Sequence, residues 1–184
     1  MALKNSVRII GGRWRGRRIA FDASTAIRPT PDRVRETLFN WLMNRIQGAK
    51  CLDLFAGSGI LGLEALSRGA EQAIFLENDS RAIEGLKAAA ALLKLSESQM
   101  VIERVDTLKW LSQEKFDVIF LDPPYDANLW SECLSLIKKN NLLAKDGVVY
   151  VEADKPLAEL IEKAGFNVIK HKQFSAVYAS LIKT

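Results

Sequence analysis

The stretch DPPY, from Asp122 to Tyr125, follows directly on the apolar run FDVIFL. Proline fixes its own φ, donates no backbone hydrogen bond and keeps the residue before it out of the helical region. Pro123 and Pro124 therefore predict a rigid loop that presents a carboxylate and an aromatic ring at the end of a buried strand. Such a loop is suited to grip a flat ligand that donates hydrogen bonds.

Methyl transfer to the exocyclic amine of a nucleic-acid base would use these groups. The lone pair of that nitrogen is delocalised into the ring, so acceptors for its N–H hydrogens raise its electron density. The Asp122 carboxylate and the Pro123 carbonyl are such acceptors, and the prolines hold them in place before reaction. Tyr125 offers a face on which a flipped or unpaired base stacks. Positioning supplies most of the catalysis in this scheme, and no metal ion is needed.

A carboxylate follows each of four predicted strands, at Asp53, Glu77, Asp106 and Asp122. Ligands of an open α/β sheet bind beyond the carboxyl ends of its strands, so these four side chains are expected to line one crevice. Helix capping is the alternative role for two of them. Asp53 suits a cap of the helix that follows, and Asp106 suits either a cofactor contact or a cap of the short helix TLKWL. Asp79 is expected to be a helix N-cap.

The loop after the first of these strands reads FAGSG, residues 55–59. Gly57 and Gly59 allow a tight turn and a close approach of a ligand to the backbone. Glu77 lies 20 residues after Gly57, a spacing that suits a carboxylate reaching the ribose hydroxyls of an adenosine. The loop also matches G-x-G-x-x-G, but Asp53 just before it would repel a diphosphate and attract a cation. A ligand with an adenosine and a positive charge, S-adenosylmethionine, meets both conditions.

The elements that must position these residues alternate from Lys50 onward. Strands are predicted for CLDLF, AIFLE, MVIERV, FDVIFL and GVVYVEA. Helices are predicted for ILGLEALSRG, for residues 80–94 and 128–139, and for the segment between Pro156 and Gly165, before a closing hairpin of FNVIKHKQF and AVYASLIK. Repeated β-α units with continuous apolar strands predict an α/β fold, with a parallel, doubly wound sheet and helices on both faces.

The first 48 residues have a different pattern. RIIGGRWRGRRIAF predicts a β-hairpin with a basic tip, and residues 22–29 a loop. A helix is expected to begin with Thr30 as N-cap and Pro31 at its first position, and to end at Gly48. Its core face is Val34, Leu38, Trp41, Leu42 and Ile46. Residues 1–48 are interpreted as a small RNA-binding extension, and residues 49–184 as the catalytic domain.

Positive charge is concentrated in this extension. The net charge of the chain is +4, whereas residues 1–35 hold nine lysines and arginines against two aspartates, which leaves −3 on the other 149 residues. A basic arm on a slightly acidic body is typical of nucleic-acid binding, although charge runs also form solvated surfaces. The predicted RNA contacts are Arg8, Arg13, Trp14, Arg15, Arg17, Arg18, Arg28 and Arg33. Trp14 is expected to pack the hairpin or to stack on a base, and Arg35 to lie with Arg28 and Arg33 beside DPPY.

Composition excludes several classes of protein. A hydrophobic fraction of 48% in 184 residues fits a globular chain, and no apolar run approaches the ~20 residues of a membrane span. Cys51 and Cys133 lie far apart in apolar runs, which predicts two buried free thiols and a reducing, cytoplasmic compartment. The single His171 cannot anchor a metal cluster, and nothing requires more than a monomer.

Together these motifs resemble a known family. The loop D-x-F-x-G-x-G, the acids after the second and third strands, and DPPY are similar to the motifs of class I methyltransferases that act on base amino groups. RIIGGRWRGRRIAF, RPTPDRVRETLFNWL and CLDLFAGSGILGLEALSRGA resemble the RsmD family of bacterial 16S rRNA guanine-N2 methyltransferases. Over essentially the whole chain, the resemblance implies a Rossmann-like, seven-stranded, mostly parallel sheet with a last antiparallel strand. It implies as substrate one guanine of 16S rRNA, in the small ribosomal subunit or its assembly intermediates.

The resemblance also assigns site residues. It implies a catalytic motif at Asp122, Pro123, Pro124 and Tyr125 and an S-adenosylmethionine site at Asp53, Phe55, Gly57, Gly59, Glu77 and Asp106. Two positions depart from the family pattern. Val105 stands where a small polar residue is usual, so Asp106 is the least secure of these assignments. Ser175 stands where glycine is expected in the final hairpin.

Three other functions compete with this interpretation. A DNA adenine-N6 methyltransferase would use the same DPPY but would normally need a further base-reading domain. A protein glutamine methyltransferase would sooner carry NPPY and would not need the basic arm. A non-catalytic RNA-binding or ribosome-assembly protein would keep the fold, but a decayed site would have lost some of Asp53, Glu77 and Asp122.

Overall fold

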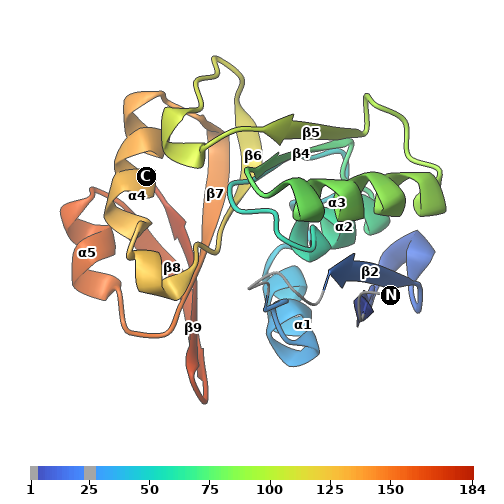
Figure 1. Ribbon diagram of the computed structural model, residues 1–184. Helices are drawn as coiled ribbons and strands as arrows, with labels where there is room; N and C mark the ends of the chain where they lie inside the picture. Colours follow the sequence, from blue (N-terminus) through green and yellow to red (C-terminus); the bar gives the residue numbers. More distant parts are fainter. Residues whose placement is uncertain (1–3, 23–27) are drawn as a thin grey trace.

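The computed structural model describes residues 4–22 and 28–184 (Figure 1). Most of the predicted loop over residues 22–29 lies outside these ranges. Seven strands form one sheet: β3 (Lys50–Asp53), β4 (Gln72–Glu77), β5 (Met100–Arg104), β6 (Phe116–Leu121), β7 (Leu143–Ala153), β8 (Asn167–Phe174) and β9 (Val177–Lys183). Their order is β5-β4-β3-β6-β7-β9-β8. The five strands from β5 to β7 pair in parallel, and β9 is antiparallel to both of its neighbours, which confirms the predicted sheet.

Helices cover both faces of this sheet (Figure 1). On one face lie α1 (Asp32–Trp41), α2 (Ile60–Ser67) and α3 (Ser80–Leu93), and on the other α4 (Trp130–Lys139) and α5 (Ala158–Lys163). Successive strand residues point to opposite faces, so Phe120 and Tyr150 join the apolar cluster under α1 to α3, while Ile119 and Val149 join the cluster under α4 and α5. Continuous apolar strands are therefore required, since both faces are buried.

The N-terminal hairpin packs onto the first of these layers. It consists of β1 (Lys4–Arg8) and β2 (Arg18–Asp22), with the short 3-10 helix η1 (Gly12–Trp14) near its tip. β2 packs against α3 and η1 against α2. Its inward side chains, Val7, Ile9, Ile19 and Phe21, belong to the same buried cluster as those of α1 to α3. The division of the chain at residue 48 stays a prediction.

The start of α1 differs from the prediction. Pro31 is the N-cap, and no side chain caps this helix. Thr30 was expected in that role, but its hydroxyl instead donates to the Asp122 carboxylate at 3.3 Å. The helix also ends at Trp41 rather than near Gly48. Its predicted core face is confirmed for Val34, Leu38, Leu42 and Ile46, all of which are buried.

The two cysteines are free and buried, as predicted. Burial raises the pKa of both thiols, which keeps Cys51 and Cys133 in their unreactive protonated form. Within residues 4–22 and 28–184, no helix is long and apolar enough to cross a membrane.

Candidate functional site

The four predicted acidic side chains come together at one edge of the sheet. Because β5, β4, β3 and β6 are parallel neighbours, Asp106, Glu77, Asp53 and Asp122 follow one another along the carboxyl ends of these strands. From β3 the chain proceeds to β4 and β5 on one side, and returns to β6 and β7 on the other. A ligand crevice is expected at such a switch point.

Glycine is required in the loop that follows β3. Gly57 and Gly59 have φ values of +53° and +73°, in the region that favours glycine. A Cβ atom added to Gly59 would lie 2.4 Å from Leu86 Cδ2, and one added to Gly62 would lie 2.4 Å from the ring of Phe75. The first two glycines therefore shape the turn, and Gly62 allows α2 to pack closely against β4.

Glu77 is fixed by the backbone around it. Its Oε2 accepts a hydrogen bond from the Gly57 amide at 2.8 Å, and its Oε1 accepts from the amides of Asn78 and Asp79 at 2.8 and 2.9 Å. A carboxylate has about four lone-pair directions, so this one can still accept from a pair of hydroxyls. Asp79 accepts from the Arg81 amide as the N-cap of α3, which confirms its predicted role.

Asp53 and Asp106 both have structural contacts. Asp53 is 2% exposed and accepts backbone hydrogen bonds from Gly62 and Phe55. Burial outweighs these bonds and raises the pKa of Asp53 to about 7. Asp106 is exposed and caps the 3-10 helix η2 (Thr107–Lys109) by accepting from the Leu108 amide at 3.1 Å. Asp106 therefore caps a helix, one of its two predicted roles. Asp53 binds the first turn of α2 through the Gly62 amide.

DPPY leaves β6 as a short extended segment before the 3-10 helix η3 (Tyr125–Ala127). Asp122 is half-buried, and burial, followed by the charges of Glu152 and Asp53, raises its pKa. Tyr125 is also half-buried, and its ring centroid lies 6.1 Å from that of Trp130 at an angle of 32°. The motif thus presents a carboxylate and a supported aromatic ring together, as the two prolines predict.

One residue of this site was missed at the sequence level. Glu152 lies on β7, beside the strand that carries Asp122, and is 2% exposed. Its Oε1 accepts from the Tyr125 hydroxyl at 3.2 Å, and its Oε2 from the Tyr150 hydroxyl at 2.7 Å. The available signal was the acid near the end of GVVYVEA, because the fifth strand also ends at the edge where the other four acids lie.

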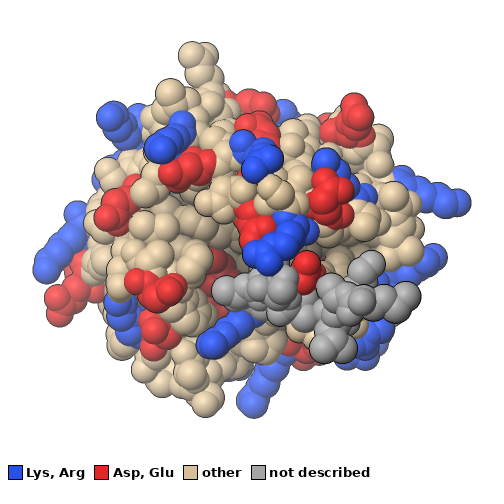
Figure 2. Space-filling view, in the orientation of Figure 1, with Lys and Arg blue, Asp and Glu red and all other residues tan. Residues whose placement is uncertain are grey.

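The arginines predicted to contact RNA are exposed. They are Arg8, Arg13, Arg15, Arg17, Arg18, Arg28 and Arg33. Figure 2 shows lysine and arginine side chains projecting along the right-hand edge, on the side where Figure 1 draws the hairpin. Trp14 is half-buried against the core, its amide donates to Ser67 Oγ at 3.0 Å, and the Arg13 guanidinium lies 3.9 Å from its ring centroid.

Arg35 was expected to lie with Arg28 and Arg33 beside DPPY, and this expectation was wrong. Arg35 is fully buried, and its Nη1 lies 2.8 Å from Oε1 of Glu64, which is also fully buried. The same guanidinium donates to the carbonyls of Arg8 and Thr30 at 2.9 and 3.0 Å. Burial lowers the pKa of Arg35, although the neighbouring carboxylates of Glu64 and Asp32 oppose this effect. Arg35 therefore joins the hairpin, α1 and α2, and does not face solvent.

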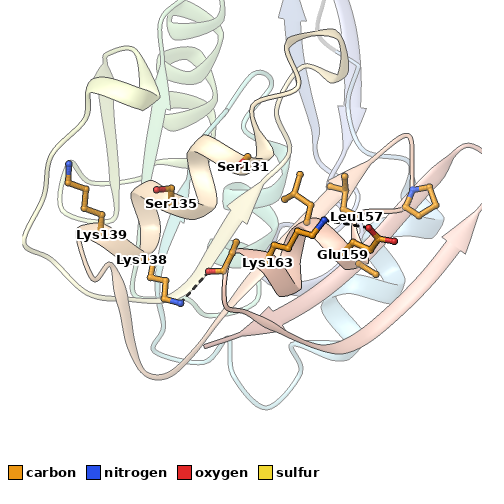
Figure 3. Close-up of a pocket in the computed structure, with 11 residues that line it drawn as sticks. Ser131, Ser135, Lys138, Lys139, Leu157, Glu159 and Lys163 are labelled. Carbon is orange, nitrogen blue, oxygen red and sulfur yellow. Dashed lines mark hydrogen bonds and ion pairs between the residues drawn. The ribbon is translucent and has the colours of Figure 1, made fainter.

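A groove of about 1030 Å³ runs between α4 and α5 (Figure 3). Two of its three lysines contact protein groups: Lys138 donates to the Ala164 carbonyl at 3.3 Å, and Lys163 lies 3.8 Å from Glu159. The residues lining this groove include none of the predicted site residues. The carboxyl ends of β3 and β6, where the predicted acids converge, are therefore the better candidate for chemistry.

Comparison with known proteins places the chain among methyltransferase relatives. A family model described as "Conserved hypothetical protein 95" matches residues 7–183. Ribosomal RNA small subunit methyltransferase D of Haemophilus influenzae is 45% identical over 173 residues, covering 92% of this chain and 89% of the relative. The protein of the same name from Escherichia coli K12 is 44% identical over 150 residues, covering 80% and 75%.

A solved structure agrees with these sequence relatives. The yhhF protein of Escherichia coli, a candidate methyltransferase, superimposes with a TM-score of 0.82 at 36% identity, covering 97% of each chain. The similarity therefore extends through the hairpin and the whole sheet.

Proposed function

Because the chain belongs to the family described as Conserved hypothetical protein 95, we propose that it methylates 16S rRNA of the small ribosomal subunit at the N2 amine of a guanine. S-adenosylmethionine is the proposed methyl donor. The observation that carries the proposal is the convergence of DPPY and three further strand-end acids at one edge of the sheet. The names of the relatives support small-subunit rRNA as the substrate.

The acidic character of this edge fits the proposed donor. Glu77, whose carboxylate is held by three amides, would accept from the ribose hydroxyls of the adenosine. Asp53 would face the cationic methionine end, and the Gly57–Gly59 turn would follow the ligand closely. Phe55 and Asp106 are proposed to flank the adenosine. A diphosphate would be repelled by the same carboxylates.

In the transfer step the chain supplies position and hydrogen-bond acceptors. When bound, S-adenosylmethionine supplies a methyl group that a nucleophile can attack in line. Asp122 Oδ and the Pro123 carbonyl would accept the two N–H hydrogens of the guanine amine, which raises the electron density on nitrogen. Asp122 then holds the proton that the nitrogen loses after transfer. Tyr125 would stack on the extruded base, and Pro124 would keep the loop rigid.

The exposed arginines of the hairpin and of α1 would bind the rRNA backbone. Arginine forms bidentate hydrogen bonds with phosphate, and each neutralised phosphate makes binding more sensitive to salt. Thr30 joins this extension to the site, because it follows Arg28 in sequence and its hydroxyl reaches Asp122. Docked rRNA would therefore approach the catalytic loop from the side of α1.

The test is a labelling experiment with three substrates. The purified chain is incubated with methyl-labelled S-adenosylmethionine and, separately, with unmethylated small subunits, free 16S rRNA and duplex DNA. Each product is digested to nucleosides, and the labelled one is identified. N2-methylguanosine from small subunits is the expected result.

Two other results would contradict the proposal in different ways. Label in N6-methyladenine from DNA would keep the cofactor and the fold but change the substrate. Bound S-adenosylmethionine with no label in any substrate would favour the non-catalytic assembly role.

A further inference from the structure

The buried side of the catalytic loop is formed by a cluster of polar groups. Tyr150, Glu152 and Asp122 lie on the same face of β6 and β7, because β7 pairs with β6 in the register that sets Val151 beside Leu121. Tyr150 and Glu152 are both buried. A carboxylate in such a place is costly unless hydrogen bonds satisfy it, and here two tyrosine hydroxyls do so.

From these contacts we propose that Glu152 is a positioning residue that fixes the ring of Tyr125 for base stacking, an inference that rests on the proposed function. Tyr125 is held at both ends, since Trp130 lies against its ring and Glu152 binds its hydroxyl. Trp130 is itself fixed by the Glu152 backbone, because its Nε1 donates to that carbonyl at 2.9 Å. Glu152 therefore fixes both aromatic rings, Tyr125 through its carboxylate and Trp130 through its backbone carbonyl.

Tyr150 supports Glu152 from the core side. Its hydroxyl donates to Glu152 Oε2 at 2.7 Å, and its ring makes an edge contact with Phe120, with centroids 6.5 Å apart. Tyr150 has no exposed surface. The carboxylate thus sits between a rigid tyrosine and the half-buried Tyr125, and its orientation is set before any substrate binds.

Positioning and proton transfer by Glu152 predict different behaviour of its glutamine variant. A glutamine side chain has the same shape, and it can accept from one tyrosine hydroxyl and donate to the oxygen of the other. Glu152→Gln should therefore restore most of the rate that Glu152→Leu loses, because leucine leaves both hydroxyls without a partner. A general base would lose its function in both variants.

The first measurement is methyl transfer to small subunits. We expect kcat to fall by about 100-fold in Glu152→Leu, the scale of a misplaced reacting group, with the dissociation constant of S-adenosylmethionine unchanged. Tyr125→Phe, which removes only the hydroxyl, should lower kcat as well. The kcat of the double variant, Glu152→Leu with Tyr125→Phe, should be no lower than that of the slower single variant. Tyr178→Phe is the matched control, because Tyr178 pairs with Ala153 and so projects from the opposite face of the sheet.

A second measurement reports on the ring itself. The chain has three tyrosines, so 3-fluorotyrosine labelling gives three fluorine NMR signals, which Tyr→Phe variants assign. Glu152→Leu should shift or broaden the signals of Tyr125 and Tyr150 and leave that of Tyr178 in place. An unchanged Tyr125 signal, additive losses of kcat, or a glutamine variant as slow as the leucine variant would overturn the proposal. If the wild-type chain labels no subunits, the proposed function fails, and the spectra still decide whether Glu152 holds Tyr125.

Discussion

Replacing Arg35 by methionine tests whether a buried ion pair holds the hairpin and α1 against α2. Methionine fills a similar volume but leaves the fully buried Glu64 carboxylate without the guanidinium at 2.8 Å. The remaining partners of Glu64 are the Ile10 amide and Arg68 Nε, the latter at 3.2 Å. The carbonyls of Arg8 and Thr30 also lose their donor.

The expected loss is large because it leaves a charge buried. Removing one partner of a buried ion pair costs about 3–5 kcal/mol. In a chain of this size 1 kcal/mol changes the Tm by roughly 2–4 °C, so Arg35→Met should lower the Tm by about 6–20 °C. The assay is urea and thermal unfolding followed by circular dichroism, with Arg33→Met on the exposed side of the same helix as control.

A second variant separates the charge from the packing. Glu64→Leu combined with Arg35→Met removes both buried charges, and such replacements are often close to neutral. The double variant should therefore recover part of the lost stability: the penalty of the buried charge is removed, but the Ile10 amide, left without an acceptor, costs about 1–3 kcal/mol. The carbonyls of Arg8 and Thr30 lack their donor in both variants. A Tm of Arg35→Met within the error of Arg33→Met would refute the assignment of a stabilising role to this pair.

Four further outcomes follow from the site and its surroundings. Asp122→Ala should retain S-adenosylmethionine binding in equilibrium dialysis and lose methyl transfer by orders of magnitude; near-normal turnover would remove Asp122 from the mechanism. Burial raises the pKa of the Asp53 carboxyl to about 7, so this group carries the charge proposed to attract the cationic ligand only above that pH. Calorimetry should therefore show an affinity for S-adenosylmethionine that rises with pH up to about 7 and then levels off. The Asp53→Asn variant should show no such rise. Replacing Arg15 and Arg17 by alanine should weaken rRNA binding and reduce its salt dependence by about 0.7–0.9 per lost phosphate contact; an unchanged slope would mean a merely solvated surface. Ser175→Gly should raise stability by about 1 kcal/mol, measured by urea unfolding, because Ser175 has a φ of +47°.

The sheet could be predicted because its signal is local. Each central strand is a continuous apolar run, and β6 begins and ends where FDVIFL does. The acids at the strand ends were found for the same reason, since a parallel sheet brings all carboxyl ends to one edge. The positions of Glu77 and Asp122 could therefore be predicted from the sequence of their own strands alone.

The errors concern polar residues whose partners lie far away in sequence. Thr30 has the residue type and position of an N-cap, yet its hydroxyl is used by Asp122, 92 residues away. Arg35 reads as a charge on a basic helix, but its partner Glu64 lies 29 residues later inside an apolar helix. Local propensity describes such residues as solvated or capping, and only the packed structure shows that they are buried.

These residues form one connected path from the hairpin to the DPPY loop. The Arg8 carbonyl and Glu64 hold Arg35, Arg35 donates to the Thr30 carbonyl, and the Thr30 hydroxyl reaches Asp122. Because every link is a hydrogen bond of a buried or half-buried group, displacing the hairpin would take the Arg8 carbonyl from Arg35, the residue that binds the Thr30 backbone beside Asp122. The extension that is proposed to bind rRNA therefore also helps to hold Asp122, the proposed catalytic acid.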